Sequence, residues 1–178
     1  ETLLAATRDA NMNKAKSVLL GTQQQRLLLR RSLKMGQTYD RLKESIIRAY
    51  GQSGWHAFKE ESAFSVQPVL PESGKFSIHQ KNGNPIAQFA GAKRGMGKVT
   101  QLNLSKKDGH WFVHLQDLIV ARKGYDPEAT ATMFEELTSA LERTKKKVGK
   151  PGASPKTLAE DVSEASQKFM FGTTEDTD

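Results

Sequence analysis

Residues 99–120 read VTQLNLSKKDGHWFVHLQDLIV, and the fold that we expect follows from this stretch. Polar and apolar residues alternate from Val99 to Ser105 and again from His110 to Val120, which is the pattern of strands with one buried face. Asp108-Gly109 lies between them, and both residues tolerate the positive φ angles of a two-residue hairpin turn. We therefore predict an antiparallel hairpin here.

Further strand signals precede this hairpin. Residues 75–80 and 85–90 alternate in the same way, and Lys81-Asn-Gly-Asn84 between them is a second strong turn signal. A weaker strand signal covers residues 63–70, where Pro68 favours an edge position. Together these segments predict an antiparallel meander of about four to five strands.

Helices are expected on both sides of the meander. Residues 3–20 and 23–34 are rich in helix formers, and Thr22 with Gln25 has the spacing of a capping box. Apolar residues continue at helical spacing to Gly51, so we predict two or three helices over residues 3–50, with Gly36 permitting a break, and a connection over residues 51–61.

The best-marked helix follows the meander. Asp126-Pro127-Glu128 has a cap, a proline at the first helical position and an acid near the positive end of the helix dipole. Its apolar stripe continues to Leu141, and we expect it to pack on one face of the sheet. After a linker at residues 151–155 the pattern predicts a short helix and a flexible acidic tail over residues 172–178.

The predicted fold class is therefore α+β, with N-terminal helices, the meander, one long C-terminal helix on a sheet face, and the tail. We divide the chain into a helical region (1–51), a sheet-and-helix core (52–149) and a linker with a short helix and tail (150–178).

Charge is unevenly distributed along the 178 residues. Lysine and arginine number 27 against 20 aspartates and glutamates, a net charge of +7. Residues 151–178 hold two bases and six acids, so the first 150 residues hold 25 bases and 14 acids, a net of +11. A basic body with an acidic tail suits a polyanionic partner, although solubility alone explains such a charge about equally well.

Two features predict where a polyanion would bind. The glycine-punctuated loop 91–98 and the turn after it carry Lys93, Arg94, Lys98, Lys106 and Lys107. This loop lacks the GxxxxGK[S/T] pattern of a nucleotide-binding P-loop and leads into a strand, so nucleotide hydrolysis is not expected. Its cations suit contacts to a phosphate backbone, and an ordinary hairpin connection is the alternative.

The second feature is the polar side of the strands. If the leucines face the core, the other face presents Phe112 and His114 among amide and hydroxyl groups, which suits stacking of nucleic-acid bases. The alternative is that the N-terminal helices cover this face and make Phe112 part of the core. Arg30 and Arg31 are supporting phosphate contacts.

The residues that catalysis needs are not arranged for it. His110 and His114 lie four apart on a strand, roughly 13 Å by strand rise, which is too far to share a metal ion. Cysteine is absent, and no GxSxG spacing marks a nucleophile. We therefore predict no enzyme, no metal and no cofactor.

The aromatic strand Gly109-His-Trp-Phe-Val-His-Leu115, preceded by other strands and followed by a helix opening Asp126-Pro127-Glu128, resembles in element order the Whirly family of single-stranded-nucleic-acid binders. The resemblance covers residues 75–147. It implies strands packed against a C-terminal helix and nucleic acid bound across the sheet. The lysine-glycine-lysine-alanine signature of that family is absent here.

The function predicted from the sequence is non-catalytic binding of single-stranded DNA or RNA, in an intracellular setting, cytoplasmic or within an organelle matrix, without a membrane span. The alternative is an assembly subunit, a homo-oligomer or part of a larger complex. It would dock protein partners through its leucine-rich helices and the segment Phe169-Met170-Phe171.

Overall fold

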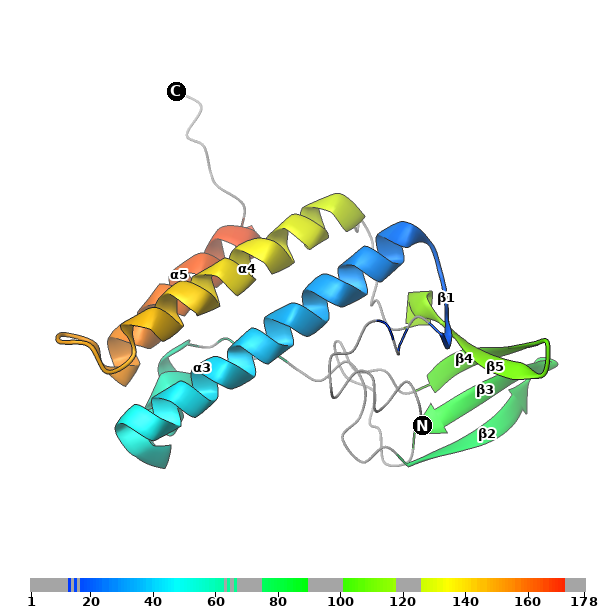
Figure 1. Ribbon diagram of the computed structural model, residues 1–178, viewed down its shortest axis with the longest axis horizontal. Coiled ribbons are helices and arrows are strands. Elements are labelled where there is room, and N and C mark those ends of the chain that lie inside the picture. The colour runs from blue at the N-terminus through cyan, green and yellow to red at the C-terminus, as the bar shows by residue number, and fades with distance from the viewer. Residues whose placement is uncertain are drawn as a thin grey trace, which may run out of the picture. The chain divides into compact units, whose positions relative to one another are not determined.

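The computed structural model describes residues 13, 15, 17–62, 64, 66, 75–89, 101–117 and 126–171, without the side chains of residues 117 and 168–171. It is an α+β fold with a long N-terminal helix, a five-stranded mixed sheet and two C-terminal helices (Figure 1). Contacts divide the chain into unit 1, Glu1–Leu33 with Gln67–Thr130, and unit 2, Lys34–Val66 with Ala131–Asp178.

The sheet of unit 1 has the strand order β1-β5-β4-β3-β2. Its antiparallel part consists of β2 (Phe76–Lys81), β3 (Asn84–Phe89), β4 (Gln101–Lys107) and β5 (His110–His114). Both predicted hairpin turns are confirmed. Asn82 and Gly83 have φ angles of 52° and 78°, and Asp108 and Gly109 have 50° and 80°, as a two-residue turn of this kind requires.

The first strand corrects only the end of the helix predicted over residues 3–20, because residues 13 and 15 are helical and residues 3–12, 14 and 16 lie outside the described part of the chain. Leu19–Leu20 form β1, which pairs in parallel with β5, Leu19 opposite Val113. The amide of Val113 donates to the carbonyl of Val18 at 2.9 Å. In the extended backbone the side chain of Leu19 is buried in the core while the main chain pairs with β5. Pairing with a strand that is distant in sequence therefore outweighs the local helix propensity of these leucines. The sheet is therefore mixed and not purely antiparallel.

Three further predicted segments fall largely or wholly outside the described residues. These are most of the strand over residues 63–70, the loop 91–98 and the tail 172–178. The fifth strand is also shorter than predicted. β5 ends at His114, and Leu115–Asp117 form a 3₁₀ turn, η1, in which Leu115 is fully buried.

The core of unit 1 lies on the leucine side of the sheet. Leu102 on β4 and Leu115 are buried together with Leu29 and Leu33 of α3 (Gln23–Ser62). The helix over residues 127–147 was predicted to cover this face, and that prediction is wrong about the partner. The cover includes the first turns of α3, whose leucine stripe is thereby buried. The buried cluster consists of Ala15, Leu19, Leu29, Leu33, Ala87, Phe89, Leu102 and Leu115.

Helix α3 begins with the predicted capping box. The amide of Thr22 donates to Oε1 of Gln25 at 2.9 Å, and the amide of Gln25 donates to Oγ1 of Thr22 at 3.2 Å. The helix continues through Gly36, where the sequence permitted a break. At Gly51 the backbone leaves helical geometry, with φ 72° and ψ −176°, and a further helical stretch continues to Ser62 in place of the predicted connection.

In unit 2 the two C-terminal helices, α4 (Pro127–Lys147) and α5 (Pro155–Phe171), pack on α3. Asp126 caps α4 as predicted, accepting the amide of Glu128 at 2.9 Å. The core combines an aromatic group from α3 with aliphatic side chains of α4 and α5. Its buried members are Met35, Tyr39, Leu42, Ile46, Trp55, Phe58, Leu137, Leu141, Leu158, Ala159 and Val162.

Candidate nucleic-acid interface

The register of β4 and β5 separates the sheet into two faces. Leu104 pairs with Val113 on the core side, and Ser105 pairs with Phe112 on the other. Since directly opposed residues of antiparallel strands point to the same face, the remaining positions follow by alternation. We call the second face the polar sheet face. Its members on the antiparallel strands are Ser77, His79, Lys81, Asn84, Ile86, Gln88, Gln101, Asn103, Ser105, Lys107, His110, Phe112 and His114.

Phe112 is half-buried. Beside it, Nε2 of His114 and Oγ of Ser105 form a hydrogen bond of 2.7 Å, whose donor depends on the histidine tautomer. This bond fixes the imidazole against the strand that opposes Phe112. The sequence prediction that Phe112 and His114 share one face with amides and hydroxyls therefore agrees with the register.

On β3 the polar sheet face is less exposed to solvent at Ile86 than it is at Phe112 on β5. Ile86 on β3 lies opposite Asn103 and is only 5% exposed. Further out, Nζ of Lys81 donates to Oε1 of Gln101 at 3.4 Å, across β3. The accessible aromatic surface is thus near β5, with a lysine and an amide toward the other edge.

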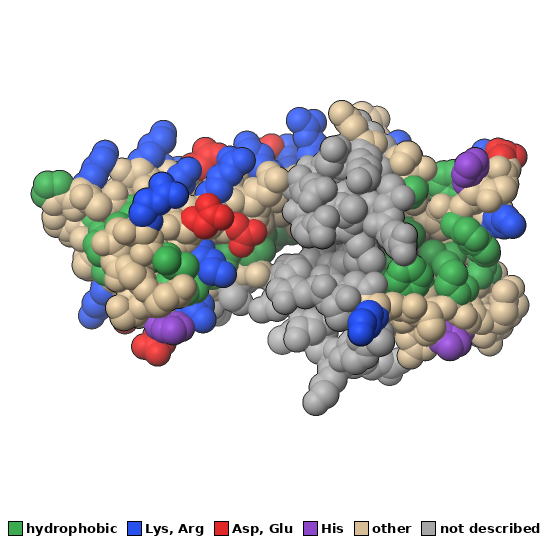
Figure 2. All heavy atoms as spheres, turned by 60° about the horizontal axis from the view of Figure 1, so that its bottom comes forward, with side chains coloured by type: hydrophobic (Ala, Val, Ile, Leu, Met, Phe, Trp, Pro, Cys, Tyr) green, Lys and Arg blue, Asp and Glu red, His purple; other side chains and the backbone are tan. Residues whose placement is uncertain are grey.

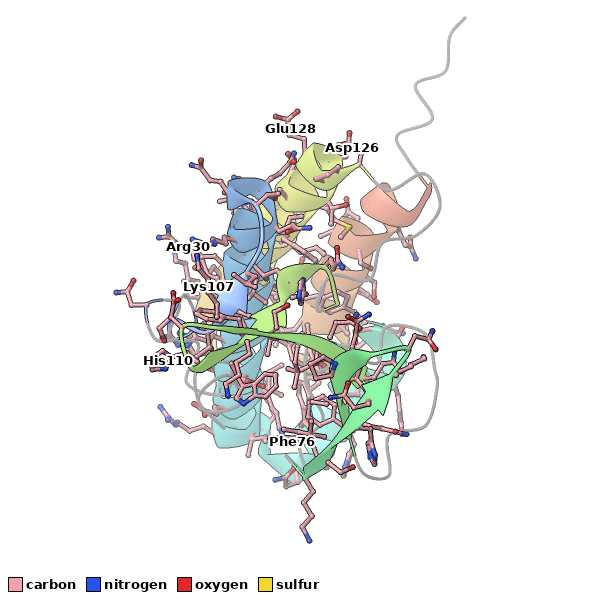
Figure 3. All side chains as sticks on the ribbon, turned by 90° about the vertical axis from the view of Figure 1, so that its right-hand side faces the viewer. Arg30, Phe76, Lys107, His110, Asp126 and Glu128 are labelled. Carbon is pink, nitrogen blue, oxygen red and sulfur yellow. The ribbon has the colours of Figure 1, made fainter. Side chains whose placement is uncertain are left out.

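The two lysines of the β4–β5 turn point to opposite faces. Lys107 pairs with His110 on the polar sheet face, and both are exposed (Figure 3). Lys106 pairs with Trp111 on the core side, with Nζ 5.7 Å from the Trp111 ring centroid. The structure therefore places Lys107 with Phe112 and separates Lys106 from both. The alternation of side chains along a strand was the sequence signal from which the separation of Lys106 and Lys107 could have been predicted.

The remaining predicted contacts lie elsewhere. Arg30 is exposed on α3, while Arg31 is half-buried and engaged in an interaction (Figure 3). Lys93, Arg94 and Lys98 lie outside the described residues. The predicted partner-binding residues Phe169, Met170 and Phe171 have helical backbone at the end of α5, and their side chains are not described.

Three large apolar side chains of the sheet are exposed. They are Phe76 at 38%, Ile78 at 53% and Trp111 at 45%, all on the core side of the sheet by register. Phe76 meets Phe89 edge-on, with ring centroids 6.2 Å apart. Figure 2 shows hydrophobic side chains on the surface of unit 1. The alternation had predicted which face they share but not how far the core cover extends.

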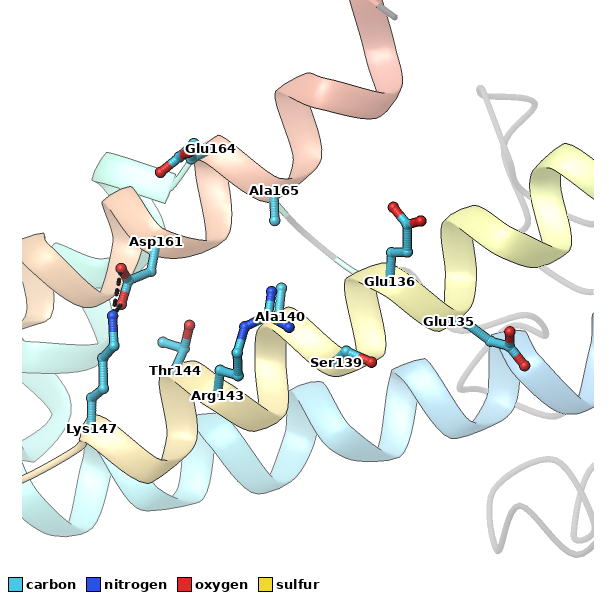
Figure 4. Close-up of a pocket in the computed structure, with 10 residues that line it drawn as sticks. All are labelled: Glu135, Glu136, Ser139, Ala140, Arg143, Thr144, Lys147, Asp161, Glu164 and Ala165. Carbon is cyan, nitrogen blue, oxygen red and sulfur yellow. Dashed lines mark hydrogen bonds and ion pairs between the residues drawn. The ribbon is translucent and has the colours of Figure 1, made fainter. Parts of the chain in front are cut away.

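Unit 2 contains a groove of about 590 Å³ between α4 and α5 (Figure 4). At one end Nζ of Lys147 contacts both carboxylate oxygens of Asp161, at 2.8 and 2.7 Å. Glu135, Glu136 and Glu164 also line it. Among the described residues, no three histidine, cysteine or acidic side chains are grouped to hold a metal ion.

No protein-family model, curated protein or solved structure matches the chain. In the part of the chain that the structure describes, no helix has the length and apolar character to span a membrane. Function is therefore inferred from the arrangement of side chains.

Proposed function

We propose that this protein binds single-stranded DNA or RNA, without catalysing a reaction, through the polar sheet face around Phe112. The observation that carries the proposal is the placement of half-buried Phe112 opposite Ser105 and beside the hydrogen-bonded imidazole of His114. A base can stack on the ring while hydroxyl, amide and imidazole groups contact base edges or sugars.

Charge supports the same interface. Lys107 stands at the turn end of the polar sheet face and Lys81 near its outer edge, so cations flank the aromatic surface. Lys93, Arg94 and Lys98 of the loop before β4 are proposed to contact phosphates, with Arg30 and Arg31 in support. Such contacts position a strand without reading its sequence.

Adjacent aromatic residues provide a matched test. Phe112→Ala removes the ring from the polar sheet face, and Trp111→Ala removes an exposed ring from the other face of the same strand. In fluorescence anisotropy with labelled oligothymidine and oligouridine, Phe112→Ala should weaken binding about fivefold or more, as loss of one stacked base predicts. Trp111→Ala should leave binding nearly unchanged.

Two results would count against the proposal. The first is that wild-type protein binds neither oligonucleotide at low salt, or binds with an affinity that does not change with salt. The second is an equal loss of affinity in both alanine variants, which would show that the oligonucleotide does not bind preferentially to the polar sheet face.

An assembly subunit is the second candidate, favoured by the exposed apolar residues of β2. The predicted leucine-rich docking surface is reduced, because α3 buries Leu28, Leu29 and Leu33 and exposes Leu27. β2 instead ends the described sheet, with Phe76 and Ile78 exposed. For this candidate function, we propose that β2 of a second copy of the chain pairs with the edge of β2.

Charge selects the register of such a pair. Antiparallel pairing centred on Ile78 would set Lys75 opposite Lys81 of the copy, which is unfavourable. Pairing centred on Ser77 sets Phe76 opposite Ile78 of the copy twice and separates these lysines. Sedimentation over a range of concentrations should then show dimers that Ile78→Lys abolishes, and a monomer at every concentration would exclude this candidate.

A further inference from the structure

A run of cations marks the connection between α4 and α5. From residue 143 to residue 156 the chain contains six basic residues and no acidic one. All six side chains are exposed, and Figure 2 shows several lysine and arginine side chains on the surface of unit 2. We call this segment the lysine turn. Its cations are Arg143, Lys145, Lys146, Lys147, Lys150 and Lys156.

Five of these six charges are available to a ligand. Lys147 is held by Asp161, while the other five form no ion pair with any described residue. The nearest carboxylates in sequence are Glu142 before the segment, and Glu160 and Asp161 after it. The local balance is therefore strongly positive even when these acids are counted.

The backbone that carries the lysine turn is fixed on both sides. The hydroxyl of Tyr50 on α3 accepts from the amide of Gly149 at 3.0 Å and donates to the carbonyl of Ala153 at 3.1 Å. At the start of α5, Ser154 and Thr157 exchange hydrogen bonds, with the amide of Thr157 donating to Oγ of Ser154 at 3.2 Å. Lys150 is therefore presented on an ordered turn.

Helix electrostatics account for only part of this arrangement. Lysines in the last turn of α4 complement the negative end of its dipole, an effect that fades beyond one turn. Lys150 lies outside both helices, and Lys156 lies in the first turn of α5, where a cation opposes the dipole. Mutual repulsion in a run of this kind also disfavours it in the absence of an anion.

We propose that the lysine turn binds the phosphate backbone of a nucleic acid and is a second contact surface of this protein, located in unit 2. The inference rests on the proposed function and extends it, since none of these residues belongs to the polar sheet face. Exposed cations on a fixed turn suit phosphates of any sequence, and ammonium groups act there as point charges.

The test compares two charge-matched triple variants of the full chain. One carries Lys145→Gln, Lys146→Gln and Lys150→Gln. The control carries Lys34→Gln, Arg41→Gln and Lys59→Gln, three exposed cations on the α3 part of unit 2. The probe is labelled oligothymidine in a salt series, and melting temperatures check that each variant is folded.

We expect the lysine-turn variant to reduce the magnitude of the negative slope of log affinity against log salt by about 2, because three phosphate contacts are lost. Its binding at low salt should weaken about tenfold or more. The control should change binding by less than about twofold if its cations make no phosphate contact. If the triple variant melts below wild type, Lys150→Gln alone carries the test, with an expected slope change of about 0.7.

The outcomes separate this inference from the proposal on which it rests. Equal losses of oligonucleotide affinity in both triple variants would show that the effect comes from the change in net charge and not from the lysine turn, which would overturn the inference. Unchanged binding by the lysine-turn variant, with Phe112→Ala still weakening it, would overturn the inference alone. Absence of binding by the wild-type chain would overturn both.

Discussion

The hydroxyl of Tyr50 and the amide of Gly149 form a hydrogen bond of 3.0 Å that joins α3 to the α4–α5 turn, and the same hydroxyl donates to Ala153. Tyr50→Phe removes both bonds and leaves the ring in place. It should lower the free energy of unfolding by about 1–2 kcal/mol in denaturant titration. Tyr39→Phe is the matched control and should cost less, because its hydroxyl makes one long bond of 3.4 Å to Phe64. Equal losses would show that the turn is not fastened in this way.

Neighbouring leucines of α3 should respond very differently to truncation. Leu29 is 2% exposed in the core of unit 1, whereas Leu27 is 41% exposed. Leu29→Ala should therefore lower the free energy of unfolding by about 2–5 kcal/mol, and Leu27→Ala by less than about 1 kcal/mol. Thermal or chemical unfolding followed by circular dichroism measures both. Comparable losses would contradict the assignment of the buried face.

The two lysines of the β4–β5 turn give a second matched pair for the interface. Lys107→Gln removes a cation from the polar sheet face. It should reduce the magnitude of the slope of log affinity against log salt by about 0.7 in oligonucleotide binding. Lys106→Gln removes the cation over Trp111 on the other face and should leave the slope unchanged. A larger effect of Lys106→Gln would place the bound strand on the core side.

Asp40 on α3 should make stability depend on pH. Partial desolvation of its carboxyl on the helix surface raises the pKa above the ordinary 3.8, Lys43 opposes the shift, and Glu44 adds to it. Because the folded state holds this proton more tightly, its contribution favours folding below pH 3.8 and is lost as pH rises through the folded pKa.

Asp40→Asn removes this unfavourable charge. The variant should melt at a higher temperature than wild type at pH 7, and the difference should shrink as the pH falls through 3.8 and approach zero near about pH 3, where the wild-type carboxyl is largely protonated in both states. Melting curves from pH 3 to pH 7 measure this. A difference that grows toward low pH would contradict the sign of the shift.

Local chemistry predicted the turns and caps well. Asn82-Gly83, Asp108-Gly109, the Thr22 capping box and the Asp126 cap depend on residues within a few positions of one another, so their outcome can be worked out from neighbours. The faces of β4 and β5 followed from alternation for the same reason. Alternation alone therefore predicts that Phe112 and His114 share one face, and the register agrees.

Long-range packing was not contained in those patterns. Leu19–Leu20 look helical locally and become a strand only because β5 offers them hydrogen bonds. The apolar stripe of α4 showed that the helix would be covered, but not by what, and its partners are α3 and α5. The spacing of Trp55 and Phe58 was a helical signal within the predicted connection, and it was missed.

The backbone of Gly51 constrains what sequence the long helix can accept. Its φ of 72° and ψ of −176° belong to a region that residues with a Cβ atom essentially do not enter. Beyond it, Trp55 and Phe58 stack at 5.3 Å inside the core of unit 2. In a saturation library selected for folded protein, position 51 should return glycine almost exclusively, while the exposed Gln52 and Ser53 beside it tolerate wide replacement.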